Sequence, residues 1–324
     1  MPANRLFHRL RLANGGWLLL IFLLALAARE ISAAPPPGYY LVWSDEFNGS
    51  SLDPTKWWVW NTPDRSGYSV PQAVTVGNGC MTITTYTTNS ANYSAIVSSD
   101  GFFRARYAYW EASVAFNGSP GMFSDFWLQS ANNGEFIGDP AASGAEIDIC
   151  EHRDTDATKT DNISGLVTID IHWDGYTNNE KSASSGLVGS GLGTGFHTYG
   201  LLWNSTNYNV SLDGVPTYST NAGISERTEI LLFSSEVDSN SFCGIVPPGG
   251  YGNFLVSTTQ TIVDYARFYT PTTTVYWVGA SLAQLVRRRQ LGVEHDSRLG
   301  ERCGFLLPEL GQFQHYFGAE YHRQ

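Results

Sequence analysis

The ten residues from 143 to 152, Ser-Gly-Ala-Glu-Ile-Asp-Ile-Cys-Glu-His, alternate between acidic and apolar side chains. Such alternation is typical of a β-strand, in which successive side chains point to opposite faces. Glu146 and Asp148 should therefore share one face, while the isoleucines beside them point into a hydrophobic core. Strict alternation would also send Glu151 into that core, where a lone carboxylate is costly.

A one-residue bulge near Ile149 and Cys150 resolves this conflict, because it returns Glu151 to the face of the other two acids. Three carboxylates in a row then share one face, although like charges side by side destabilise a sheet. Structure gains nothing from such a row, so we interpret it as a functional site. The alternative is a solvated acidic face that binds calcium through its oxygen atoms.

Glycoside hydrolysis requires two carboxyl groups that flank the scissile bond, one ionised and one protonated. Neighbouring negative charge raises the pKa of one member of such a pair and keeps it protonated near neutral pH. The short spacing on one strand face predicts about 5–5.5 Å between the two glutamates, the separation of a retaining enzyme. Asp148 lies between them and can hydrogen-bond to the nucleophile.

Short strands bounded by Gly, Pro, Asn or Asp surround this motif, and no helical crossover separates them. We therefore predict an all-β fold, a β-sandwich jelly roll of two antiparallel sheets with a concave substrate cleft. The predicted strands are Val70–Val76, Met81–Tyr86, Ala108–Phe116, Phe123–Gln129, Ala145–Glu151, Leu166–Trp173, Thr198–Trp203, Tyr208–Leu212, Glu229–Ser234 and Thr261–Tyr269.

The composition excludes some classes of partner. The chain has 324 residues with 30 acidic and 19 basic side chains, a formal net charge of −11. Nucleic acids and anionic membranes require a basic face, so neither is expected as a partner. Charged residues make up 15% of the chain, below the usual share of roughly 25%, which argues against long salt-bridged helices.

The two ends of the chain differ from its body. Residues 1–34 combine early arginines, a short apolar run and small residues, the pattern of a secretory signal peptide. Residues 35–270 form the expected catalytic domain, and residues 271–324 form a linker and an arginine-rich tail of unknown role. Export would allow disulfides to form. Cys80, Cys150 and Cys243 could then contain one bridge, or they could be three buried thiols.

The motif Glu146-Ile147-Asp148-Ile149-Cys150-Glu151 resembles the E-x-D-x-x-E signature of glycoside hydrolase family 16, a family of concanavalin A-like lectin/glucanase jelly rolls. The extra residue before the last glutamate is similar to the bulged, laminarinase-like branch. Further segments resemble the family in the same order along the chain. They are residues 42–49 (Val-Trp-Ser-Asp-Glu-Phe-Asn-Gly), 109–112, 126–128, 172–176, 196–200 and 263–269.

The resemblance implies a role for each acid of the motif. Glu146 is the expected nucleophile, Asp148 its assisting carboxylate and Glu151 the general acid and base. The resemblance implies no cofactor for catalysis. It does imply a possible structural calcium ion, held in part by Asp264, with Gly79 and Glu46 as weaker candidate ligands.

Aromatic side chains near the motif are candidates for substrate binding, because they offer rigid apolar surface to sugar rings. We consider Trp110, Trp127, Trp173 and Trp203, together with His172 on the strand expected to follow the catalytic one. A place in the core of the sandwich is the alternative for each tryptophan, and a purely structural role is the alternative for the histidine.

The sequence thus predicts a secreted, retaining endo-glycosidase of a β-linked polysaccharide, most readily a β-1,3-glucan of the laminarin type. We expect a monomer without a membrane anchor after signal cleavage, with a polysaccharide as its partner. A galactan hydrolase similar to agarases or carrageenases is the first alternative. A noncatalytic, lectin-like carbohydrate-binding module is the second, and transglycosylation by the same covalent intermediate is also open.

Overall fold

The computed structural model describes residues 35–271. The expected signal peptide, the tail from residue 272 onward and Cys303 lie outside the described residues. Within the described part, no helix has the length and apolar character needed to cross a bilayer.

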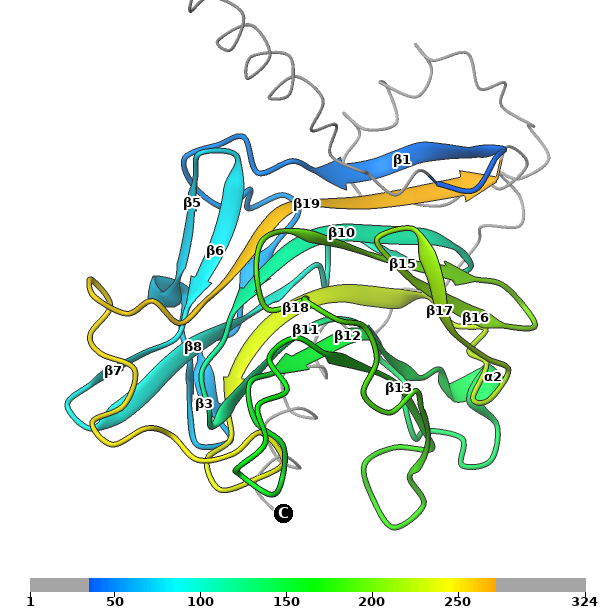
Figure 1. Ribbon diagram of the computed structural model, residues 1–324. Coiled ribbons are helices and arrows are strands. Elements are labelled where there is room, and N and C mark those ends of the chain that lie inside the picture. The colour runs from blue at the N-terminus through cyan, green and yellow to red at the C-terminus, as the bar shows by residue number, and fades with distance from the viewer. Residues whose placement is uncertain (1–34, 272–324) are drawn as a thin grey trace, which may run out of the picture. The chain divides into compact units, whose positions relative to one another are not determined.

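Two β-sheets face each other (Figure 1). One sheet has eight strands, which are β1 (Tyr39–Asp45), β5 (Val74–Gly77), β6 (Cys80–Thr84), β10 (Ala108–Asn117), β15 (His197–Trp203), β16 (Tyr208–Leu212), β17 (Val215–Thr220) and β19 (Gln260–Pro271). Their order is β17-β16-β15-β10-β19-β6-β5, and β1 pairs with β19. All of these pairings are antiparallel.

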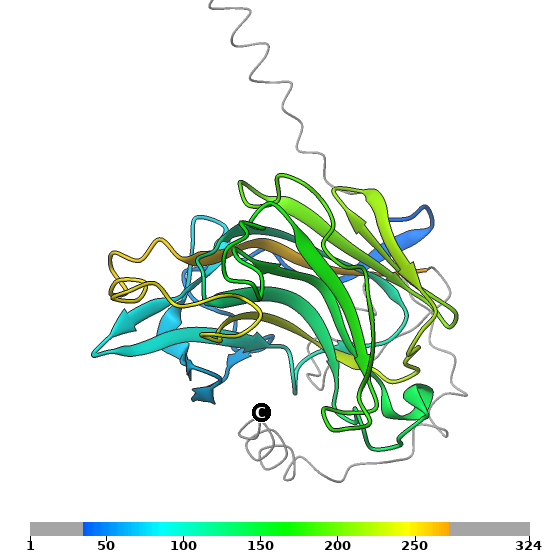
Figure 2. The same cartoon turned by 60° about the horizontal axis from the view of Figure 1, so that its bottom comes forward.

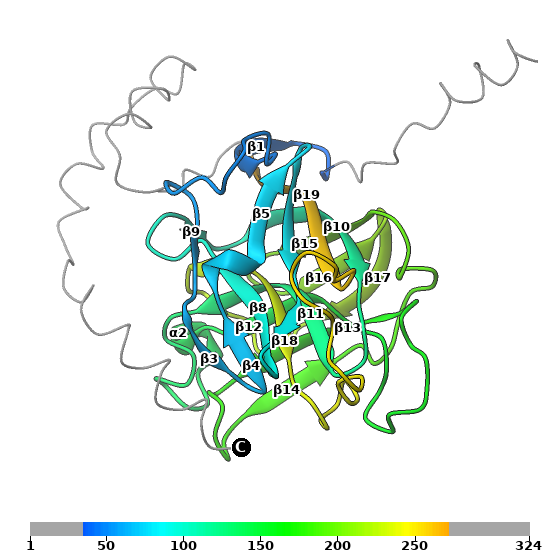
Figure 3. The same ribbon diagram turned by 90° about the vertical axis from the view of Figure 1, so that its left-hand side faces the viewer.

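The second sheet has eleven strands, which are β2 (Trp58–Val59), β3 (Thr62–Asp64), β4 (Gly67–Ser69), β7 (Tyr86–Thr88), β8 (Ala91–Ser98), β9 (Arg104–Ala105), β11 (Met122–Ser130), β12 (Glu146–Arg153), β13 (Val167–Trp173), β14 (Lys181–Ser184) and β18 (Glu229–Val237). Their order is β14-β13-β12-β11-β18-β8-β4-β3, with β2 and β7 beside β8 and β9 beside β18. One pairing, β4 with β8, is parallel. Figure 2 shows that the long strands of this sheet curve, and Figure 3 shows β3 and β4 beside β8 at its edge.

The architecture confirms the predicted jelly-roll sandwich, although two predicted strands are interrupted. Met81–Tyr86 breaks at Thr85, between β6 of one sheet and β7 of the other. The segment Val70–Val76 is not a continuous strand, because Pro71–Ala73 form a turn of 3₁₀ helix and β5 begins only at Val74. Proline lacks the N–H that a strand donates to its neighbour, and its fixed φ suits the first turn of a helix. The other helix between residues 35 and 271, α2 (Pro140–Ser143), is a single turn that leads into β12.

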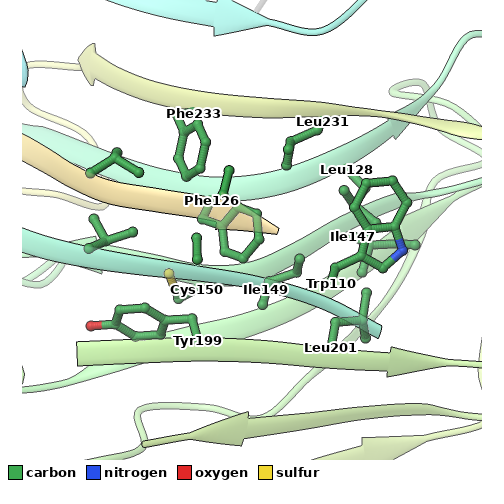
Figure 4. Packing of buried hydrophobic residues seen from close by; sticks show 14 of the residues in the cluster. Trp110, Phe126, Leu128, Ile147, Ile149, Cys150, Tyr199, Leu201, Leu231 and Phe233 are labelled. Atoms are coloured by element: carbon green, nitrogen blue, oxygen red, sulfur yellow. The ribbon is translucent and has the colours of Figure 1, made fainter. Parts of the chain in front are cut away.

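The hydrophobic core lies between the two sheets and fixes the direction in which β12 presents its side chains. Ile147, Ile149 and Cys150 point into this core and are fully buried. Figure 4 shows them beside side chains from β10, β11, β15 and β18. Their acidic neighbours on β12 consequently face the other way, toward the outer face of the eleven-stranded sheet, which is turned away from the eight-stranded sheet.

A buried carboxyl group anchors the start of β12. Glu229 is fully buried, accepts a hydrogen bond of 2.5 Å from the Ser225 hydroxyl, and lies 3.4 Å from the backbone nitrogen of Ala145. Gly144 makes this approach possible, because its φ is +82° and a Cβ atom there would lie 2.1 Å from Ser130 Oγ. Burial raises the pKa of Glu229 to about 8.

The glutamate pKa predicts how stability depends on pH. In the unfolded chain Glu229 has its ordinary pKa of 4.5, whereas in the folded protein the pKa is about 8. The stability that Glu229 contributes is therefore fully present below pH 4.5 and is lost as the pH rises through 8. The free energy of unfolding falls by up to about 1.4 kcal/mol per pH unit in this range. Glu229→Gln, which mimics the protonated acid, should be less sensitive than the wild type to a shift from pH 5 to pH 8. Thermal unfolding at both pH values measures this, and an equal loss of stability in both proteins would contradict it.

Candidate active site

The strand register confirms the predicted bulge. Trp127 of β11 lies opposite Asp148, and Phe126 lies opposite Cys150, so β12 contains one extra residue at this point. The register with β13 shifts at the same place, between Asp148 and Glu151. Since Ile149 and Cys150 are both buried in the core, Glu151 returns to the outer face.

Three side chains of β13 face the acids of β12 across the sheet. His172 lies opposite Glu146, Asp170 opposite Asp148, and Thr168 opposite Glu151. Directly paired residues in a sheet point to the same face. The outer face thus contains the three acids of the motif and a fourth carboxyl group from β13.

Glu146 is half-buried and receives a hydrogen bond from the Tyr176 hydroxyl, which also lies 2.8 Å from Gln129 Oε1. Burial raises the pKa of Glu146, whereas the nearby His172 and the hydrogen bond from Tyr176 lower it. The net direction is upward, and these last two interactions are the ones that favour the carboxylate form, which a nucleophile requires.

The loop after β13 holds Tyr176 in place. Gly175 N–H donates to Asn133 Oδ1 at 3.1 Å, and the backbone of Gly175 packs on Gly134 so closely that a Cβ atom on Gly134 would lie 2.7 Å from Gly175 Cα. Beside them, the buried Asp174 accepts a hydrogen bond of 2.8 Å from Gly138 N–H and one of 2.7 Å from Lys181 Nζ.

Asp148 lies between the two glutamates and is buried. Its pKa is raised well above the usual range, first by burial and then by the negative charges of Asp125, Glu146 and Glu151. His172 Nε2 lies 3.6 Å from Asp148 Oδ2, and His172 Nδ1 lies 2.9 Å from Glu180 Oε1. Asp148 therefore favours the protonated form, in which it can donate a hydrogen bond to a neighbouring carboxylate.

Glu151 is held at one of its two oxygens. Arg153 Nη1 donates to Glu151 Oε1 at 2.6 Å, and the Thr168 hydroxyl donates to the same oxygen at 3.0 Å. Burial raises the pKa of Glu151 and the Asp170 charge raises it further, whereas Arg153, Thr168 and Arg65 lower it. The net direction is upward, as a general acid requires.

The aromatic candidates divide between the two faces of the sheet. Trp127 lies on the outer face, in a small apolar cluster with Ile96, Ile230 and Leu232, and Trp60 packs against it. Trp127 therefore lies on the same face as the acids, and it is 6% exposed.

The expectation that Trp110 and Trp203 bind substrate is wrong, because both are fully buried in the core between the sheets. Trp173 also belongs to the inner side, since it follows His172 on β13 and packs on Gly223 and against the core. Of this neighbouring pair, His172 is therefore the residue that faces the acids.

Several residues at the site were not singled out from the sequence. Asp125 and Gln129 share the outer face with Trp127, and the period-two alternation of β11 contained that signal. Arg153 and Asp170 could have been found in the same way on β12 and β13. Tyr176 reaches Glu146 from a loop, and no local pattern indicates such a contact.

The residues expected to hold calcium lie mainly on the eight-stranded sheet. Asp264 follows Val263, which pairs with Met81 of β6, and the charge of Asp264 adds to burial in raising the pKa of the Cys80 thiol. Asp264 and the turn at Gly79 are thus close together, as shared oxygen ligation requires. Glu46 fits poorly, because Arg267 binds both of its carboxylate oxygens, at 2.7 and 3.0 Å.

Solved structures with the same fold include several polysaccharide hydrolases. The endo-β-1,3-glucanase of Pyrococcus furiosus superposes with a TM-score of 0.57 at 18% identity, over 72% of this chain and 94% of that one. The laminarinase of Flavobacterium sp. UMI-01 superposes with a TM-score of 0.56 at 19% identity, over 71% of this chain and 100% of that one.

A curated relative is the clotting factor G alpha subunit of Tachypleus tridentatus, 28% identical over 202 residues. The match covers 58% of this chain but spans only 28% of the length of that protein.

A family model described as the glycoside hydrolase family 16 domain of β-porphyranases A–D matches residues 41–270. This range contains both sheets and every carboxyl group of the outer-face site. The chain therefore belongs to glycoside hydrolase family 16.

Proposed function

We propose that this protein is a retaining endo-glycosidase that cleaves a β-linked polysaccharide by double displacement. The observation that carries this proposal is the row of Glu146, Asp148 and Glu151 on one face of the sheet, with different partners around each acid. The groups that oppose burial differ: Tyr176 and His172 lower the pKa of Glu146, whereas Arg153 and Thr168 lower that of Glu151. We base the different roles of the two glutamates on these different partners.

Glu146 is the nucleophile. In the first step its carboxylate attacks the anomeric carbon, and the bond from that carbon to the leaving oxygen breaks as Glu151 transfers its proton to that oxygen. In the second step Glu151, now a carboxylate, takes a proton from a water molecule whose oxygen attacks the same carbon and releases Glu146. Two inversions at one carbon give net retention.

Asp148 assists the nucleophile in this scheme. When protonated, it donates a hydrogen bond toward Glu146 and separates the charges of the two glutamates. Trp127 presents an apolar ring beside the acids, and we propose that it supports a sugar ring. His172, oriented by Glu180, is placed to contact substrate on the same face.

We propose a β-1,3-glucan as the substrate. The outer face contains many carboxyl groups, including Asp125, Asp170 and Glu236, which favour a neutral polysaccharide over a sulfated one. Proteins that share the fold are named laminarinases and an endo-β-1,3-glucanase.

A galactan of the agar or carrageenan type is the second candidate. The matching family model is named for β-porphyranases, and two arginines, Arg65 and Arg153, lie near the candidate acids. Both arginines already pair with carboxylates, Arg65 with Glu236 and Arg153 with Glu151, which leaves less charge for a sulfate group.

The remaining expectations complete the proposal. We propose that the protein is exported, acts as a monomer and needs no cofactor for the reaction. A structural calcium ion would bind Asp264 and backbone oxygens at the turn around Gly79, remote from the reacting groups in sequence and on the other sheet.

Replacing the nucleophile should abolish hydrolysis without unfolding the protein. Glu146→Gln removes the attacking carboxylate, so we expect a loss of at least about 10³-fold in kcat. Removing one of several like charges should leave the midpoint of thermal unfolding nearly unchanged. Glu226→Gln, which changes an exposed acid, is the matched control and should keep full activity. Substantial residual hydrolysis by Glu146→Gln would contradict the mechanism.

A panel of polysaccharides tests the proposed substrate and the stereochemistry of the reaction. Residues 35–271 are incubated with laminarin, mixed-linkage glucan, agarose, porphyran and carrageenan, and the products are sized. We expect oligosaccharides from laminarin, and proton NMR of the first products should show a retained anomeric configuration. Release from porphyran or agarose alone would select the galactan, and inverted products would exclude double displacement.

A further inference from the structure

Arg153 makes the shortest polar contact to the candidate acid and base. Its Nη1 atom lies 2.6 Å from Glu151 Oε1 and 3.1 Å from Thr168 Oγ1, and Thr168 itself donates to Glu151 Oε1 at 3.0 Å. These three contacts connect Arg153 Nη1, Thr168 Oγ1 and Glu151 Oε1 to one another. Because Oε1 is occupied, the reaction proton belongs on Oε2.

Packing holds Arg153 itself in position. Its side chain is only 14% exposed, and its guanidinium carbon lies 5.2 Å from the centre of the Phe242 ring. A cation over an aromatic face gains an attraction that strengthens when water is excluded. The arginine is thus a fixed charge beside Glu151, which is itself only 16% exposed.

This charge opposes what the proposed reaction requires. A general acid must be protonated before the first step, yet a cation at 2.6 Å favours the carboxylate. Burial and the charge of Asp170 act in the other direction, so that the pKa of Glu151 is raised overall. Asp170 reaches Glu151 diagonally, since it lies two residues from Thr168 on the same face of β13.

Other ionisable groups also face Glu151, and they come from five different parts of the chain. The acids among them are Glu146 and Asp148 on β12, Asp125 on β11 and Glu236 on β18. The other two are Arg65 in the β3–β4 turn and the buried thiol of Cys243 in the loop after β18. Burial and neighbouring negative charge raise the pKa values of Asp125 and Asp148 well above the usual range, so both favour the neutral form while Glu151 titrates. Arg153 and Asp170 remain as the charges with the largest opposing effects on the pKa of Glu151.

We propose that Arg153 is a positioning residue that holds Glu151 by Oε1 and, balanced against Asp170, sets the pH range over which Glu151 carries its proton. This inference rests on the proposed role of Glu151 as general acid and base. The arginine orients Oε2 toward the leaving oxygen and stabilises the carboxylate that the first step produces. Burial and the charge of Asp170 favour protonation of Glu151 again before the next cycle.

The test compares two variants with opposite expected effects. The alkaline limb of kcat/KM reports deprotonation of the general acid in the free enzyme. Arg153→Met removes the cation and should move this limb to higher pH, whereas Asp170→Asn removes the anion and should move it to lower pH. Each shift should be about one pH unit, the lower end of what a charge at this range produces.

Three further variants separate charge from shape. Arg153→Lys keeps the charge and should leave the limb near its wild-type position, although kcat falls because the planar guanidinium no longer packs over the Phe242 ring. Thr168→Val removes only an uncharged hydrogen bond and should shift the limb less than Arg153→Met does. Arg106→Met removes an exposed arginine that contacts Tyr107 and a backbone carbonyl, and it should shift nothing.

A measurement without substrate keeps this proposal distinct from the proposed function. The carboxyl carbon of Glu151, labelled with ¹³C and assigned through Glu151→Gln, is titrated by NMR in the wild type and in the two charge variants. Opposite shifts of its pKa would support the balance even if no polysaccharide were cleaved. Shifts in the same direction, or no shift in folded protein, would overturn the inference. A wild type that binds no polysaccharide and cleaves none would instead overturn the proposed function.

Discussion

Glu151 reaches the outer face only because β12 carries one residue more than its neighbours between Asp148 and Glu151. Ile149 and Cys150 both enter the core, and this double insertion reverses the alternation of the strand. Without it, the last acid would enter the space occupied by core side chains such as Leu201 and Phe126, where an unpaired carboxylate is costly. The apolar packing in Figure 4 is therefore what turns three acids toward one side.

The negative charges of the acids on that side repel one another, and different neighbouring groups stabilise each acid. Glu146 has Tyr176 and His172, Glu151 has Arg153 and Thr168, and Asp148 has mainly other acids around it. Each acid therefore has its own set of partners, although burial raises the pKa of all three. The same principle appears away from the site, where Glu229 is buried among hydroxyl and amide donors without a cation in its hydrogen bonds.

The sequence predicted the fold, the bulge and the facing of the acids because each depends on local alternation and on the cost of burying charge. Three of the four tryptophans were misplaced because a strand residue can face either side. Trp173 faces the core from the sheet that carries the site, whereas β10 and β15 belong to the opposite sheet. Trp110 and Trp203 consequently point into the core from the eight-stranded sheet. Tyr176 could not be found from local pattern, since its contact with Glu146 depends on how two glycine-containing loops pack.

The three cysteines of the described residues are free thiols, and Cys150 stands at the bulge itself. Its sulfur is fully enclosed by the core, and burial raises the pKa of the thiol well above its ordinary value. An alkylating reagent can reach this atom only when β12 separates from the layer beneath it. The protein thus contains a native chemical probe for local opening of the strand that carries its acids. The rate at which the Cys150 thiol is alkylated would report how often this strand opens locally.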